Sequence, residues 1–128
     1  MNEIAREWLS IAEADMGTAT RELEVDGVPN PRAAAFHAQQ AAEKALKALL
    51  IQVRVESPRT HSLEPLLDLL PPPPLPELVA MRSDLRLLSR FAVRARYPGH
   101  DVAADEASQA VAIAATVLQS VHSALAKL

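Results

Sequence analysis

The sequence predicts an all-α protein, an antiparallel up-and-down four-helix bundle with one short additional helix. Hydrophobic residues make up 49% of the chain and aromatic residues only 3%, so Leu, Val, Ile and Ala must form the core, which suits close-packed helices better than a sheet. Apolar residues also recur at three- and four-residue steps over long stretches, separated by short connections rich in turn-forming residues. At 128 residues the chain matches the size of one domain. We therefore expect one helical domain over residues 1–128 and no strand.

A first helix is predicted over residues 3–24, with Asn2 available as its cap. Trp8 is expected to anchor its apolar face, and Asp15 lies beside that face, where it either bonds a neighbouring helix or is solvated. Gly17 costs about 1 kcal/mol relative to Ala in a helix interior, so it either permits a close helix contact or marks a bend. The apolar face comprises Ile4, Trp8, Ala12, Met16, Ala19 and Leu23.

The longest uninterrupted helical pattern covers residues 31–54. Asn30 can cap this helix, and Pro31 fits its first position because a backbone donor there would be unpaired anyway. One apolar stripe follows its length, formed by Ala38, Ala42, Ala45, Leu46, Leu49 and Val53. A polar strip adjoins it, formed by His37, Gln40, Lys44 and Lys47. We expect the stripe to pack against other helices and the strip to be available for polar contacts.

The middle of the chain predicts a short helix, a stiff connection and a further long helix. The short helix is expected over residues 62–70 and the long one over residues 76–94. Between them the prolines of residues 71–76 cannot form a helix interior and favour polyproline II geometry, as a spacer or as a Pro-rich ligand for a partner. Three arginines of the long helix lie four residues apart and form either a phosphate track or a solvated face; they are Arg82, Arg86 and Arg90.

Residues 96–101, RYPGHD, end that helix at Pro-Gly and lead into the last one. Asp101 is expected to cap the last helix, and Asp105 and Glu106 in its first turn favour the helix dipole. Its apolar stripe continues nearly to the C-terminus, through Ala107, Val111, Ala114, Leu118, Val121, Leu125 and Leu128.

Composition and charge exclude several classes of function. The net charge of -3 argues against broad, charge-driven nucleic-acid binding, although a local basic patch is compatible with it. Cysteine is absent and the four His are scattered, so we expect no disulfide, no metal site and no cofactor. The apolar runs are judged too short and too often interrupted by charge to span a bilayer. We therefore predict a cytoplasmic protein with no membrane contact.

Three stretches together resemble the HEPN family of small helical domains. FHAQQAAEKALKALL at residues 36–50 is similar to the signature helix of that family, THSL at residues 60–63 to the helix start that follows, and RYPG at residues 96–99 to its late motif. AEADM, around Asp15, is similar to the opening helix. The resemblance covers almost the whole chain, and its signature helix is more specific than amphipathic patterning demands.

The resemblance implies a helical bundle that usually forms a homodimer and was proposed to bind nucleotides. Such proteins are often encoded beside a minimal nucleotidyltransferase, as a toxin–antitoxin pair, and many relatives are metal-independent ribonucleases. Their active residues are an Arg and a His four to six positions apart, which implies Arg94 with His100 here, or the shorter pair Arg96 and His100. Ala95 stands where a polar residue is common, and Pro98 interrupts the spacing. In some relatives a Tyr near this motif accepts a nucleotide, a role that Tyr97 matches only in part.

Two groups of residues are chemically suited to nucleotides or RNA. Cleavage by the 2'-hydroxyl needs a proton-transfer group such as His100 and a cation such as Arg94 or Arg96 at the phosphate. Alternatively, His100 only finishes a turn and both Arg side chains are solvated. The second group offers ammonium groups for phosphate and an imidazole or amide for a base or ribose, or else forms interhelical hydrogen bonds or a solvated face. It comprises His37, Gln40, Lys44 and Lys47, with Tyr97 as a further contact or a packing residue.

Three functions follow from these residues and the resemblance. The leading one is a nucleotide- or RNA-binding HEPN-like protein, one member of a nucleotidyltransferase-linked toxin–antitoxin pair. The second is an active metal-independent ribonuclease toxin that uses an Arg and His100. The third is a scaffold that docks a nucleotidyltransferase and has no ligand of its own. The sequence leaves open whether the protein is an enzyme.

Overall fold

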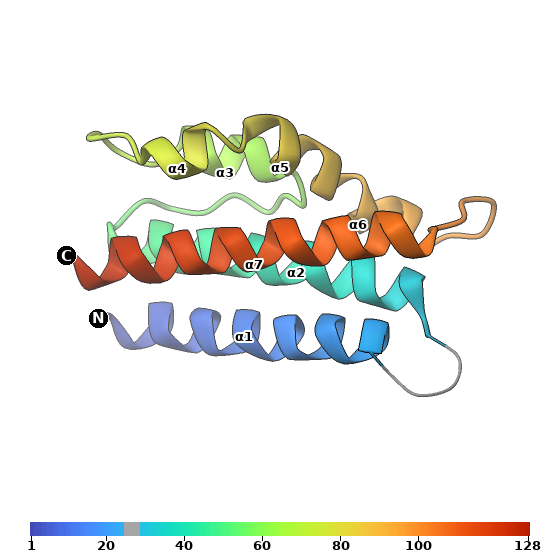
Figure 1. The fold of residues 1–128 in the computed structure, drawn as a ribbon. Coiled ribbons are helices and arrows are strands. Elements are labelled where there is room, and N and C mark those ends of the chain that lie inside the picture. The colour runs from blue at the N-terminus through green and yellow to red at the C-terminus, as the bar shows by residue number, and fades with distance from the viewer. Residues whose placement is uncertain (25–28) are drawn as a thin grey trace.

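The computed structural model describes residues 1–24 and 29–128, which contain helices and no strand (Figure 1). Three helices are long: α1 (Glu3–Glu24), α2 (Pro31–Gln52) and α7 (Ala104–Ala126). Four are short: α3 (Leu63–Asp68), α4 (Pro76–Val79), α5 (Arg82–Ser89) and α6 (Phe91–Arg94). The all-α prediction is confirmed.

The long helices lie side by side, with α2 running back along α1 and α7 running in the same direction as α2 (Figure 1). Both termini therefore lie at one end of the bundle, and the connection from α6 to α7 lies at the other. The short helices α4, α5 and α6 cross from the first end to the second on top of α2 and α7, with α3 beside them. Together they form the third leg of an up-and-down bundle.

Helix α2 is the centre of the bundle and contacts α1, α3, α5, α6 and α7. Of its 22 residues, 13 are buried. Seven of the buried residues are alanines with no exposed surface: Ala34, Ala35, Ala38, Ala41, Ala42, Ala45 and Ala48. Because these side chains are small, the neighbouring helices can approach the α2 backbone closely from several sides.

Both predicted asparagine caps are present. The Oδ1 of Asn30 accepts a hydrogen bond from the backbone N–H of Ala33 at 3.1 Å, and the Oδ1 of Asn2 accepts one from Ile4 at 2.8 Å. Helix α2 ends two residues earlier than predicted because Arg54 adopts a left-handed conformation, with φ of 63°. This conformation lets the Val55 N–H bond the carbonyl of Leu50 at 2.9 Å and close the helix end.

The buried face of α1 is rotated relative to the predicted stripe. Its fully buried residues include Ala5 and Ala12, whereas Ile4 is 57% exposed and Ile11 50% exposed. The reason is that α1 packs on α2 and α7 and leaves its outer flank in solvent. Among the described residues, a Cβ at Gly17 would meet only the flexible guanidinium of Arg21, at 3.3 Å. Gly17 therefore permits no close contact with another helix.

The single helix predicted over residues 76–94 is wrong, because it is divided into α4, α5 and α6. At both breaks the backbone forms hydrogen bonds to the residue three positions earlier, which is the tighter 3₁₀ geometry. The N–H of Met81 donates to the carbonyl of Leu78, and the N–H of Arg90 donates to the carbonyl of Leu87. The three pieces contact different neighbours: α4 lies against α7, α5 against α2, α3 and α7, and α6 against α2. The bends allow each piece to bury its own apolar residues.

Two of the three arginines for which a phosphate track or a solvated face was left open are paired with α3. Arg86 Nε lies 2.9 Å from Glu64 Oε1, and Arg82 contacts both Glu64, at 3.2 Å, and Asp68. Arg86 and then Arg82 hold the pKa of Glu64 below its usual value. These ion pairs join α3 to α5, and Arg90 alone of the three has no such pair among the described residues.

The predicted cap of the last helix is also wrong. Helix α7 begins at Ala104, and Glu106 Oε1 accepts from the Ala103 N–H at 3.1 Å, so Glu106 caps the helix start instead of Asp101. By length and hydropathy α7 would suffice to cross a membrane, contrary to the expectation from sequence. Its apolar residues, however, include part of the bundle core, and 44% of its most apolar stretch of 18 residues is buried. Helix α7 therefore contributes to the core of the bundle.

Candidate functional site

The loop between α6 and α7 is anchored by Arg32, in the first turn of α2. Arg32 Nη1 donates to the carbonyls of Arg94 at 3.0 Å and Tyr97 at 3.2 Å, and Nη2 donates to the carbonyl of His100. One guanidinium thus satisfies three backbone acceptors, which its fixed fork of donors allows. Gly99, with φ of 92°, supplies the left-handed residue that reverses the chain.

Arg94 crosslinks the two sides of this loop. Its Nη1 lies 3.0 Å from Glu106 Oε2, its Nη2 donates to the carbonyl of Asp101 at 2.9 Å, and its guanidinium lies 5.4 Å from the centre of the Phe91 ring. Arg94, followed by the backbone N–H of Ala103, lowers the pKa of Glu106. The Arg94 guanidinium therefore has protein partners on both of its terminal nitrogens, and it connects α6 to the start of α7.

Arg96, Tyr97 and His100 extend outward from the same loop. The guanidinium carbon of Arg96 lies 5.8 Å from the centre of the Phe36 ring and 6.0 Å from that of Tyr97. Tyr97 is 54% exposed, and Arg96 and His100 are also exposed. Within the described part of the chain no carboxylate pairs with Arg96. The loop thus presents one unneutralised cation, one aromatic face and one imidazole to solvent.

The polar strip predicted on α2 is turned toward α1. Asp15 of α1 receives two of its side chains, with Oδ1 3.1 Å from His37 Nδ1 and Oδ2 2.6 Å from Lys44 Nζ. The exposed fractions are 15% for the Asp15 side chain, 33% for His37 and 22% for Lys44. Of the two roles left open for Asp15, the structure shows the interhelical bond.

A second, deeper polar cluster surrounds Glu43, which is 4% exposed. Its carboxylate lies 3.1 Å from Lys47 Nζ and 2.9 Å from His61 Nδ1. Gln39 Nε2 donates to the carbonyl of His61 at 2.8 Å, and Gln40 Nε2 donates to Gln39 Oε1 at 2.7 Å. These bonds fasten the connection after α2 to the helix, and no buried side-chain polar atom in the described residues lacks a partner.

The structure therefore separates the predicted site residues into two places. Arg94, Arg96, Tyr97 and His100 share the loop, whereas His37, Gln40, Lys44 and Lys47 lie along α2 with partners inside the protein. The described residues contain no cluster of three His or acidic side chains suited to a metal ion.

Sequence reasoning missed two residues at the start of α2. Arg32 holds the loop, and the ring of Phe36 lies beneath Arg96. They are spaced four residues apart at the start of α2, so a helical pattern places them on one face. Nothing in the local sequence connects that face to carbonyl groups more than sixty residues later in the chain.

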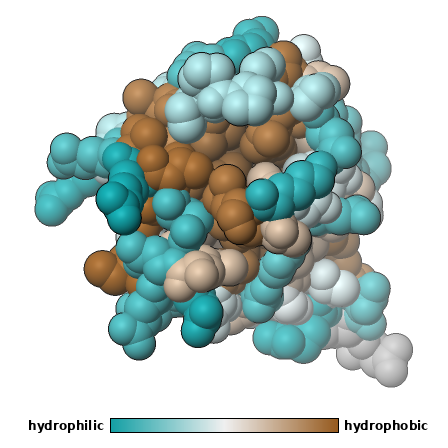
Figure 2. Space-filling model, turned by 90° about the vertical axis from the view of Figure 1, so that its left-hand side faces the viewer, coloured by the Kyte–Doolittle hydropathy of each residue, from teal (hydrophilic) through white to brown (hydrophobic). Residues whose placement is uncertain are grey.

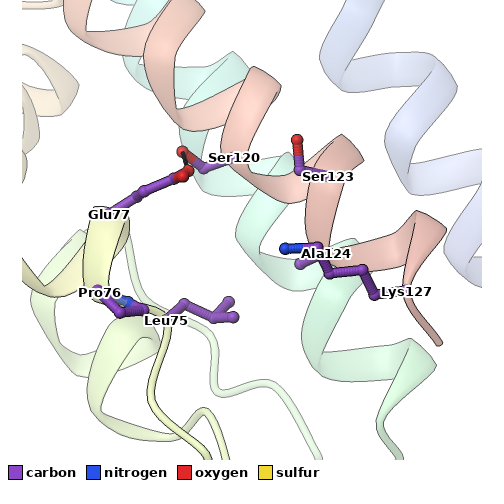
Figure 3. A pocket seen from close by; sticks show the side chains of 7 residues that line it. All are labelled: Leu75, Pro76, Glu77, Ser120, Ser123, Ala124 and Lys127. Carbon is purple, nitrogen blue, oxygen red and sulfur yellow. Dashed lines mark hydrogen bonds between the residues drawn. The ribbon is translucent and has the colours of Figure 1, made fainter.

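Two cavities of about 290 and 280 Å³ lie at the opposite end of the bundle, near both termini. The first is drawn in Figure 3 and is lined by residues of α4 and of the last turns of α7. Neither cavity includes a residue that the sequence had singled out as catalytic or nucleotide-binding, but the proline run of residues 71–76 lines part of the second one.

Comparison with known proteins gives one family match and one similar solved structure. The model of the HEPN domain family matches residues 5–124. The crystal structure of TT1696 from Thermus thermophilus is similar, with 30% sequence identity and a TM-score of 0.84 over 96% of this chain and 98% of that one. A comparison with curated proteins gives no match.

The Arg94–Glu106 pair gives a pH-dependent prediction for Glu106→Gln. Because the pKa of Glu106 is lowered in the folded protein, its contribution to stability is complete above its ordinary value of 4.5 and is lost as the pH falls through the lowered value. We expect the variant to lose about 0.5 to 1 kcal/mol of unfolding free energy at neutral pH, the range of a solvent-screened ion pair. Urea unfolding, followed by circular dichroism at neutral pH and at a pH below the lowered pKa of Glu106, measures the difference in unfolding free energy between the variant and the wild type.

In strong acid the two proteins should be equally stable. Glu7→Gln, at an exposed position of α1, removes the same charge without an ion pair and serves as the control. A stability loss for Glu106→Gln that stays constant from neutral to acidic pH would contradict the assignment of this ion pair.

Proposed function

Because the chain belongs to the HEPN family, we propose that it binds nucleotides or single-stranded RNA through the loop between α6 and α7. Membership in this family supports a nucleotide- or RNA-related role for a helical protein. The observation that carries the proposal is the exposed Arg96 guanidinium, which lies over both the Phe36 and the Tyr97 ring and has no carboxylate partner among the described residues.

This arrangement suits the two chemical features that every nucleotide offers. A guanidinium binds phosphate through two parallel hydrogen bonds, and an exposed aromatic ring provides a face on which an unpaired base stacks. Arg96 and Tyr97 supply these two groups from adjacent positions. The overall charge of -3 means that the attraction is local to this loop, so binding depends on few phosphate contacts and on stacking.

The residues of the loop take different roles in this proposal. Arg96, Tyr97 and His100 contact the ligand, whereas Arg32 and Arg94 position the loop because their guanidinium groups are bonded to its backbone and to Glu106. The polar residues of α2, His37, Gln40, Lys44 and Lys47, act in the interface with α1 and the connection that follows α2.

A metal-independent ribonuclease is the second candidate function, favoured by the exposed imidazole of His100 in the same loop as Arg96. In such a reaction the 2'-hydroxyl attacks the adjacent phosphorus and the bond to the 5'-oxygen breaks, which leaves a 2',3'-cyclic phosphate and a free 5'-hydroxyl. His100 would transfer the proton, and Arg96 would stabilise the charge that develops on the phosphate.

Partners are a further part of the proposal. A toxin–antitoxin pair with a minimal nucleotidyltransferase, a homodimer and a cytoplasmic location are all compatible with a small helical domain of this family. The half-exposed Ile4 and Ile11 lie on the outer flank of α1 and supply an apolar surface for a second subunit. The alternative is a scaffold that docks a nucleotidyltransferase and whose loop binds no nucleotide or RNA.

We predict that Arg96→Ala weakens binding to RNA by about 1.5 to 3 kcal/mol, since it removes charge-assisted hydrogen bonds to the phosphate. Fluorescence anisotropy with a labelled single-stranded RNA of mixed sequence measures the affinity. Arg6→Ala removes the same charge from an exposed position near the start of α1, and this variant should bind RNA as the wild type does. Equal losses in both variants would indicate nonspecific attraction and contradict the proposed site.

We predict that, if the protein cleaves RNA, His100→Ala abolishes cleavage while RNA binding remains. Purified protein is incubated with mixed cellular RNA in the presence of a chelator, and the product ends are tested for cyclic phosphate. Cleavage retained by the folded variant would exclude His100 as the proton-transfer residue. Binding without cleavage by the wild type would support the binding function alone.

A further inference from the structure

Two adjacent cavities, together called the groove, lie at the end of the bundle that holds both termini. They share Leu75, Ala124 and Lys127, so the two hollows are adjacent on the surface between the proline-rich connection and the last turns of α7. Figure 2 looks onto this end and shows hydrophobic residues gathered at its centre within a hydrophilic rim. This groove lies at the far end of the bundle from the loop between α6 and α7.

One half of the groove carries two opposite charges. Glu77 comes from α4 and Lys127 from the end of α7, and both line the cavity of about 290 Å³ (Figure 3). Ser120, which is 7% exposed, donates to Glu77 Oε2 at 3.2 Å and so orients the carboxylate. Among the described residues neither Glu77 nor Lys127 forms an ion pair. Both charges are therefore available to a ligand.

The other half of the groove is apolar and stiff. The cavity of about 280 Å³ is lined by the end of α2, the proline run, and the end of α7, with Lys127 as its single charged residue among those described. Its apolar walls include Leu49 and Val53 of the end of α2, Pro71 and Pro72 of the proline run, and Leu128 after α7. Consecutive prolines hold their wall in a fixed shape, because each has little backbone freedom. The wall is thus already formed before a ligand arrives.

We propose that this groove binds a free amino acid with an apolar side chain. The ammonium group of the ligand meets the Glu77 carboxylate, its carboxylate meets the Lys127 ammonium, and its side chain enters the apolar half. A ligand with both charges satisfies the acid and the base at once, whereas a simple carboxylic acid or amine leaves one of them unused. The spacer predicted at residues 71–76 is therefore also one wall of a ligand site.

The size of the groove favours a small molecule over a peptide. Each cavity lies at or just below the lower end of the range for small-molecule sites, about 300 to 1,000 Å³. Apolar walls with a few convergent polar groups are the usual composition of such sites. The site is separate from the RNA-binding loop, so the two proposals stand or fall independently.

The test is a titration of the labelled protein with L-leucine and L-phenylalanine, followed by the backbone amide signals in two-dimensional NMR. We expect L-leucine to shift the signals of α7 from Ser120 to Lys127. Isocaproate, which lacks the ammonium group, and isoamylamine, which lacks the carboxylate, should bind roughly three- to tenfold more weakly.

Two charge variants test which charged group of the ligand each protein residue binds. Glu77→Gln should weaken L-leucine binding by roughly three- to tenfold and leave the binding of isocaproate, which has no ammonium group, unchanged. Lys127→Met should also weaken L-leucine binding by roughly three- to tenfold, and it should leave the binding of isoamylamine, which has no carboxylate, unchanged. Glu24→Gln, at an exposed position near the other end of the bundle, is the control and should bind L-leucine normally. No shift with either amino acid, or equal affinity for L-leucine and isocaproate, would overturn the proposal.

Discussion

The burial of α2 is the constraint on which the rest of the structure depends. Its alanines allow helices to pack around it, and in consequence almost no side of it remains for solvated side chains. Polar residues on such a helix must find partners, because a buried charge without one is costly. Asp15 of α1 accordingly bonds His37 and Lys44, and Glu43 bonds Lys47. The polar strip of α2 thus bonds partly to α1, through His37 and Lys44, and partly within α2, through Lys47.

The same helix also connects the core to the proposed site. The first turn of α2 is capped by Asn30 and held by the bundle, so Arg32 projects from a fixed position and bonds three carbonyls of the loop. Phe36, one turn later, lies beneath Arg96. A surface loop bonded in this way presents Arg96, Tyr97 and His100 in a defined arrangement without any secondary structure of its own, which is the preorganisation that binding sites require.

The long helices α1, α2 and α7 and the Asn2 and Asn30 caps were predictable, because they depend on local periodicity and capping chemistry. That one loop region carries Arg94, Arg96, Tyr97 and His100 was predictable because these residues are close in the chain. The breaks between α4, α5 and α6 were not, since they depend on which neighbouring helix each piece meets. Asp101 was mistaken for the cap because the sequence does not show that Arg94 holds its carbonyl within the loop. The hydrogen bonds of Arg32 could not be predicted, because they depend on how α2 packs against a loop that is far away in the sequence.

In the proposed function Arg32 holds the loop in the shape that binds RNA, and Arg32→Met tests this most directly. The variant keeps the aliphatic stem of the side chain and loses its five donors, and Arg6→Met is the control for the loss of charge. Affinity for single-stranded RNA is measured together with hydrogen exchange of the amides of residues 95–103. We expect a folded variant with faster exchange in this loop and weaker binding than the control. Faster exchange with unchanged affinity would contradict the role assigned to Arg32.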